Sequence, residues 1–144
     1  MAANWKHYLI SLLLIMILDV CWIKFYFSTP YFAQVQEIQG TELVFRMGNA
    51  VAAYSFMILG LFVITIPNID ASTNATLLKT CAQFGTTLGA VIYGTYAFTC
   101  AAIFTNFKLS IAIQDTVWGT FLYTVVPLIT FAVVRAIEDK QKGI

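Results

Sequence analysis

The sequence has very little charge. Charged residues make up 10% of its 144 positions, and the formal net charge is +1. Soluble domains carry about 25% charged residues, so this chain cannot cover a surface that faces water. It also offers no basic patch for phosphate groups. These shortages exclude a cytosolic enzyme, a nucleic-acid-binding protein and a disordered segment.

Residues that bind metals are scarce as well. The chain has one histidine and three cysteines, and Cys21, Cys81 and Cys100 each fall inside an apolar run. No pair or cluster of them has the spacing of a zinc site. We therefore expect the cysteines to pack as small apolar residues, and we expect no metal, no cofactor and no set of catalytic residues.

Hydrophobic residues, in contrast, make up 60% of the chain, and the mean hydropathy is +0.81. A helix needs about 20 apolar residues to cross a bilayer. Four stretches meet this length, at residues 8–27, 47–66, 78–104 and 109–134. They are apolar on nearly all sides, unlike the alternating strands of a barrel. The sequence predicts an all-α, polytopic integral membrane protein in which residues 1–144 form one four-transmembrane-helix bundle.

The remaining segments are a hydrophilic loop at residues 28–46 and a polar C-terminal tail at residues 135–144. Ser28-Thr29-Pro30 is expected to end the first helix. The aromatic and aliphatic residues that follow recur at roughly helical spacing, so the loop is either a short helix at the membrane surface or an irregular segment.

Four spans place both termini on the same side of the membrane. Five cations accompany the termini and three lie at the opposite face. This distribution predicts cytoplasmic termini by the positive-inside rule. The five are Lys6, Lys79, Arg135, Lys140 and Lys142, and the three are Lys24, Arg46 and Lys108.

Polar residues inside the predicted spans fall in one half of the bilayer. Asp19 precedes the end of the first helix by eight residues, and Asp115 lies about six residues into the fourth. At a rise of about 1.5 Å per residue, both lie roughly 9 to 12 Å below the face remote from the termini. Asn49, Tyr93 and Tyr96 occupy the same half, so we expect every helix to contribute to one polar layer.

Each aspartate is followed by a tryptophan three residues later, on the same helix face. A carboxylate in the membrane costs about 2.5 to 3.5 kcal/mol on insertion scales and therefore faces the bundle interior. It either forms a functional site or fastens helices together by hydrogen bonds. The candidate residues for binding a ligand or proton are Asp19, Trp22, Asn49, Tyr93, Tyr96, Asp115 and Trp118.

Two further features concern helix packing. Gly85-x-x-x-Gly89 predicts a close approach between helices. Pro127 deprives the carbonyl of Tyr123 of its usual donor and predicts a kink in the fourth helix.

Three motifs together resemble the domain of unknown function 2177 family of small four-helix membrane proteins. They are Leu18-Asp19-Val20-Cys21-Trp22-Ile23, Tyr93-Gly94-Thr95-Tyr96-Ala97-Phe98-Thr99 and Asp115-Thr116-Val117-Trp118-Gly119. The resemblance implies four transmembrane helices and brings no established activity. Ala97 and Cys100 stand where the family pattern has Asp and Asn, which removes one carboxylate. Members occur in bacteria and in large DNA viruses of eukaryotes, so the resemblance does not identify the host membrane.

Three functions remain open at this point. The first is an intramembrane polar site that binds or translocates a proton, an ion or a small or lipid ligand. The alternative is a structural or assembly component of a membrane, a virion membrane included. The third is a lipid-modifying enzyme, against which the lack of a catalytic histidine and of a nucleophile motif counts. We expect membrane lipids, a second copy of the chain or other membrane proteins as partners, and no nucleic acid.

Overall fold

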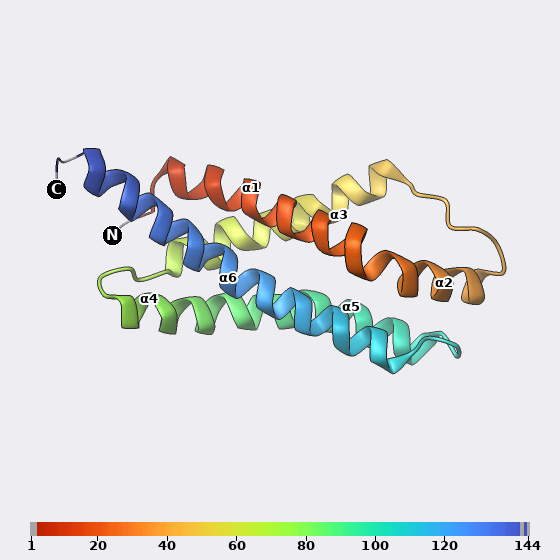
Figure 1. The fold of residues 1–144 in the computed structure, drawn as a ribbon. Helices are drawn as coiled ribbons and strands as arrows, with labels where there is room; N and C mark the ends of the chain where they lie inside the picture. The colour runs from red at the N-terminus through yellow and green to blue at the C-terminus, as the bar shows by residue number, and fades with distance from the viewer. Residues whose placement is uncertain (1–2, 142, 144) are drawn as a thin grey trace.

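The computed structural model describes residues 3–141 and 143, and they fold into four long helices without any strand (Figure 1). All four are long and apolar enough to span a membrane, which confirms the predicted fold class. Lys142, one of the cations counted above, lies outside the described residues. The first helix comprises α1 (Trp5–Trp22), the π-helical turn η1 (Ile23–Phe27) and α2 (Ser28–Gln39), and the second comprises α3 (Met47–Gly60), η2 (Leu61–Thr65) and η3 (Ile66–Asn68). The third comprises α4 (Asn74–Thr80), η4 (Cys81–Thr86) and α5 (Thr87–Ile103). The fourth is the single helix α6 (Leu109–Gln141).

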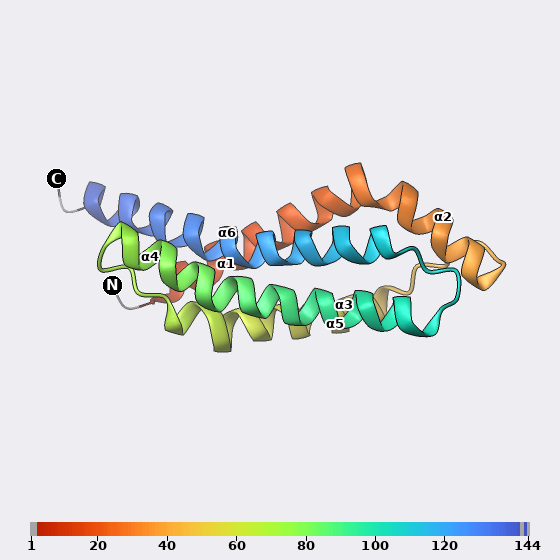
Figure 2. The ribbon, with the colours of Figure 1, turned by 90° about the horizontal axis from the view of Figure 1, so that it is seen from below.

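The four helices run up and down along one axis. The start of α1, the end of α6 and the connection 69–73 share one end of the bundle, which we call the terminal end (Figure 1). Connections 40–46 and 104–108 share the other, which we call the loop end. Helix α6 packs mainly against α5 and α1, and Figure 2 shows it lying beside both along the bundle.

The prediction that Ser28-Thr29-Pro30 ends the first helix is wrong, and of the two forms left open for the segment that follows, the structure has the helix. Residues 28–39 are helical, and α2 continues the first helix through Pro30. A proline inside a helix removes one backbone donor. The π-helical turn η1 precedes it, and there the Ser28 N–H bonds the carbonyl of Ile23, five residues back. The helix ends at Gly40, whose φ of 70° is accessible because glycine lacks a Cβ.

The polar tail expected at residues 135–144 is helical as far as Gln141, because α6 continues without a break. Arg135 connects this part of α6 to the segment around the connection 69–73 at the terminal end. Its guanidinium donates to Asn74 Oδ1 at 2.8 Å and to the carbonyl of Ala71 at 2.5 Å. These bonds hold the end of the fourth helix against the start of the third.

The surface of the bundle is apolar, as a lipid environment requires. Phe25 is 79% exposed and Phe56 74%. The interior is apolar at mid-height, where Ile15, Leu61 and Leu122 are completely buried.

Glycines bring the third and fourth helices close together, which confirms the prediction from Gly85-x-x-x-Gly89. A Cβ added at Gly89 would collide with the backbone of Gly119, and one added at Gly119 would collide with the Tyr93 ring. At Gly85 the obstacle is the carbonyl of Tyr123, the group that Pro127 leaves without its usual donor. Close packing of this kind drives association where lipid supplies no hydrophobic force between helices.

We predict that Gly89→Ala lowers the free energy of unfolding by about 1 to 3 kcal/mol, because the added methyl group overpacks the contact between α5 and α6. Gly94→Ala is the matched control on the same helix. Its Cβ would meet only the Thr116 side chain, at 3.4 Å. The control should be neutral or more stable by up to about 1 kcal/mol, from helix propensity. Reversible unfolding in mixed micelles measures both, and equal effects would contradict the packing described here.

Candidate functional site

The carboxylate of Asp19 binds all three other helices. Its side chain is only 4% exposed. Oδ2 accepts a hydrogen bond from Tyr54 Oη of α3 at 2.7 Å. Oδ1 accepts one from Tyr93 Oη of α5 at 3.1 Å and one from Trp118 Nε1 of α6 at 2.8 Å. We call Asp19, Tyr54, Tyr93 and Trp118 the hub.

Every donor of the hub has a partner. A carboxylate offers about four lone-pair positions, and three donors occupy three of them here. The indole N–H of Trp118 can only donate, so its bond to Oδ1 sets the orientation of the indole ring. In this arrangement Asp19 holds four helices and positions Trp118.

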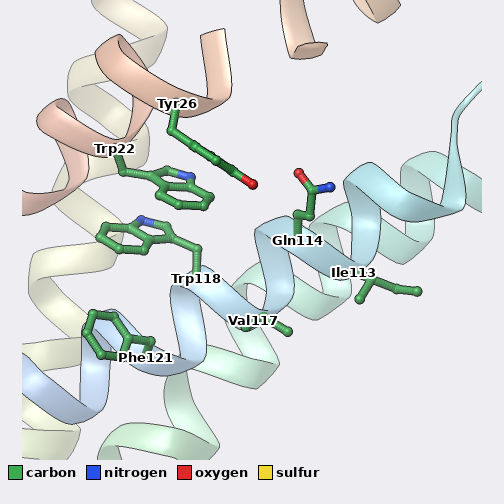
Figure 3. A pocket seen from close by; sticks show the side chains of 7 residues that line it. All are labelled: Trp22, Tyr26, Ile113, Gln114, Val117, Trp118 and Phe121. Carbon is green, nitrogen blue, oxygen red and sulfur yellow. The ribbon is translucent and has the colours of Figure 1, made fainter. Parts of the chain in front are cut away.

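Trp118 stacks on the second predicted tryptophan, Trp22. Their ring centroids are 4.4 Å apart and the planes differ by 5°. Tyr26 continues the stack on Trp22 at 4.4 Å, and Phe121 lies 5.7 Å from Trp118. The four rings form a ladder that runs from η1 to α6 (Figure 3).

The ladder forms one wall of a groove of about 360 Å³, which we call the aromatic groove. Figure 3 shows the Tyr26 hydroxyl and the Gln114 amide facing one another at its polar edge. Val117 is 62% exposed and Phe121 51%, so the groove opens sideways toward lipid. The lining consists of Trp22, Tyr26, Ile113, Gln114, Val117, Trp118 and Phe121.

Asp115 follows Gln114 on α6 and is half-buried, and it is not one of the residues that line the groove. It is near enough to Asp19 and Tyr93 to interact with them electrostatically. Between the described residues, no hydrogen bond or ion pair involves its carboxylate. Two of the cations assigned to the loop end have other neighbours. Lys108 pairs with Glu37 at 3.7 Å, and Lys24 lies 5.6 Å from the centre of the Phe25 ring.

Tyr96 joins a second polar group nearer the loop end. Its hydroxyl lies 2.7 Å from that of Tyr31 on α2. One turn further along α2, the completely buried Gln34 accepts a bond from the Lys108 N–H at 2.7 Å and so caps the start of α6. The segment expected as a loop therefore supplies two polar contacts, and the buried side chain of Gln34 makes one of them.

Among the predicted site residues, Asn49 alone stays apart from these groups. It is exposed at the start of α3. Tyr54 takes its place in the hub, and sequence reasoning missed it. The depth estimate could have found it, because Tyr54 follows the start of α3 by seven residues, about 10 Å along the axis. That is the depth assigned to Asp19.

Other chemistry is limited at this site. In the part of the chain that the structure describes, no three His, Cys, Asp or Glu side chains are placed to hold a metal ion. Ala97 and Cys100 are both buried, at 1% and 9% exposure. An Asp and an Asn at these positions, as in the family pattern, would add polar groups inside the bundle near Tyr31 and Tyr96.

We predict that Tyr54→Phe lowers the free energy of unfolding by about 1 kcal/mol, the usual size of a hydrogen bond between membrane helices. Tyr8→Phe is the control, since no described residue bonds its hydroxyl and its ring packs edge-on against Phe62. A double-mutant cycle with Asp19→Asn isolates the bond. Zero coupling between the two positions in mixed micelles would show that the hub does not form.

Comparison with known proteins identifies the family to which the chain belongs. No curated protein and no solved structure matches the chain. The model of a family described as a predicted membrane protein, DUF2177, matches residues 4–132. Because this match covers most of the sequence and all four spanning helices, the protein belongs to the domain of unknown function 2177 family.

Proposed function

We propose that the protein binds an amphiphilic ligand of the membrane in the aromatic groove, and that the head group of this ligand carries an ammonium ion. The observation that carries the proposal is a lipid-facing groove with aromatic walls. The residue that follows Gln114 of this groove on α6 is Asp115, whose carboxylate has no partner among the described residues. Among the functions that the sequence left open, this proposal corresponds to the first, in its form as a site that binds a lipid ligand.

The shape and depth of the groove suit an amphiphile. Gln114 follows Leu109, the first residue of α6, by five residues, which is about 7 to 8 Å along the axis. Tyr and Trp side chains are typical of this interfacial depth, where one end of a ligand is apolar and the other wet. A hydrocarbon chain would lie along Val117 and Phe121, with its head group beside Tyr26 and Gln114.

Charge selects the head group. The seven lining residues include no cation, and Asp115 follows Gln114 directly. A carboxylate and aromatic faces both attract an ammonium ion, the second by cation–π interaction worth about 0.5 to 2 kcal/mol. An anionic head group would meet repulsion from Asp115 at the same place.

The hub supports this site without being the site. All three donors of the hub bind the Asp19 carboxylate, and Asp19 is buried, so the hub presents no free donor to a ligand. It holds Trp118 in the orientation that stacks on Trp22 and forms the wall of the groove. Asp19 is therefore a positioning residue in this proposal, and Asp115 is the residue that contacts the ligand.

Translocation of a proton or ion has less support. Toward the terminal end from the hub, Ile15, Leu122 and Val126 are all completely buried and apolar. A charged species would have to cross this layer without a polar partner, at a cost of several kcal/mol.

The alternative, a structural or assembly component, is favoured by the hub itself. Three interhelical bonds on one carboxylate would fasten the bundle whether or not a ligand binds. The two functions differ in their consequences at Asp115, which fastens nothing among the described residues. A role in assembly would leave ligand binding independent of this residue.

We predict that native mass spectrometry of the protein, released from mixed-lipid nanodiscs, finds phosphatidylcholine retained at least threefold over phosphatidylglycerol. Asp115→Asn should abolish the preference, because it removes the charge that selects the head group. Trp22→Leu should reduce retention of both lipids, since it removes the stacked wall.

Phe56→Leu serves as the control in this experiment, because Phe56 is an exposed aromatic residue on α3 outside the groove. It should behave as wild type. Equal retention of the two lipids by wild type, or an unchanged preference in Asp115→Asn, would contradict the proposed ligand. Loss of folded protein in Trp22→Leu would leave Asp115→Asn as the deciding variant.

We also propose cytoplasmic termini, which the excess of Lys and Arg at the terminal end supports. A fluorescent protein that matures only in the cytoplasm, fused after residue 144, should fluoresce in bacterial cells. Alkaline phosphatase in the same position should be inactive. The opposite pair of results would reverse the orientation.

A further inference from the structure

Three side chains in the terminal half of the bundle are completely buried, and each carries a polar atom without a hydrogen-bond partner among the described residues. They are His7 on α1, Thr65 at the end of η2 and Thr130 on α6, each 0% exposed. No hydrogen bond from the described residues reaches His7 Nε2, Thr65 Oγ1 or Thr130 Oγ1. Buried polar groups are normally hydrogen-bonded, so three exceptions together require an explanation.

The three residues share one level of the bundle. His7 is twelve residues from Asp19, Thr130 twelve from Trp118 and Thr65 eleven from Tyr54, all toward the terminal end, which places each about 16 to 18 Å from the hub. Neighbouring contacts agree with this level. The His7 ring lies 4.3 Å from that of Phe131, and the Tyr8 ring lies 5.1 Å from that of Phe62.

The two threonines differ from most other helical hydroxyl residues in this chain. The hydroxyls of Thr116, Thr120 and Thr124 each bond the carbonyl four residues back, which is the usual choice for threonine in a membrane helix. Thr65 and Thr130 do not make this bond. Their hydroxyl groups are thus free to bind something within the bundle.

The contacts of Nδ1, on the opposite side of the His7 ring, determine whether Nε2 is a hydrogen-bond donor or an acceptor. Nδ1 lies 3.1 Å from the backbone N–H of Asn4, which it caps as an acceptor, and 3.0 Å from Asn4 Oδ1. The Asn4 oxygen already accepts a bond from the Lys6 N–H at 3.1 Å. We assign the proton to Nε2, because Nδ1 then accepts from the Asn4 N–H and completes the capping box at the start of α1. The unpartnered atom is then a buried N–H donor.

We propose that His7, Thr65 and Thr130 bind an internal water molecule. Water is the ligand that suits this set, since it can accept from Nε2–H and donate to both hydroxyl oxygens. A buried water of this kind typically makes about three hydrogen bonds. The site is separate from the hub and from the aromatic groove, because the apolar layer of Ile15 and Leu122 lies between.

His7 is the only histidine in the sequence, which permits a direct test. Protein labelled with ¹⁵N-histidine, in nanodiscs and without a histidine tag, gives one pair of ring nitrogen signals. We expect Nε2 to carry the proton and that proton to show magnetisation transfer with water in an apolar region of the bundle. Absence of any contact with water would overturn the proposal.

Substitution of a threonine by valine gives a second test through the sign of its effect. If water binds Thr130, Thr130→Val removes one of its partners and lowers the melting temperature, by about 3 °C. If Thr130 is simply unpaired, the same change removes a buried orphan hydroxyl and raises the melting temperature. Thr65→Val should behave alike, and the double variant should lose less than the sum, because both residues share one water.

The control is Thr120→Val, whose hydroxyl bonds a carbonyl of its own helix at 2.7 Å. Its effect on melting should not depend on the other two substitutions. A rise in melting temperature for Thr130→Val, or strict additivity with Thr65→Val, would overturn the shared water site.

Discussion

The structure depends on three hydrogen bonds to one carboxylate. Lipid gives no hydrophobic reason for helices to associate, so close packing and polar contacts must hold the bundle together. The Asp19 carboxylate is the group in the first helix whose burial in the membrane costs the most free energy. It lies where each of the other three helices presents a hydrogen-bond donor. Once the group is buried, separating any helix would leave a polar atom without a partner in an apolar medium.

The other close contacts agree with this arrangement. Glycines on α5 and η4 let the third helix approach α6, and the vacant side of Gly119 accommodates the ring of Tyr93, a hub residue. Close helix packing and the hub therefore depend on each other. The same bonds orient Trp118, so the stability of the bundle and the shape of the aromatic groove have a common origin.

The bundle contains polar groups at three levels with different chemistry. In the hub, all three donors bind the buried Asp19 carboxylate. Near the loop end, Tyr26 and Gln114 line a groove that opens toward lipid, where we propose that a ligand binds. In the terminal half, His7 and the two threonines each carry a buried polar atom without a partner among the described residues. The apolar layer at Ile15 separates the last level from the others, so each can be tested alone.

The sequence by itself determined the class of fold and the depth of the site. Long apolar runs, scarce charge and the need to satisfy every backbone group in lipid leave only a helical bundle. Helix rise alone predicted that Asp19, Asp115, Asn49, Tyr93 and Tyr96 would lie in the same half of the bilayer. The tertiary structure decided which side chains bond. Tyr54 rather than Asn49 completes the hub, because rotation of a helix about its axis depends on packing and not on depth. The continuation of the first helix through Pro30 and the burial of His7 likewise depend on contacts with α6 and its flanking loop, which no local pattern shows.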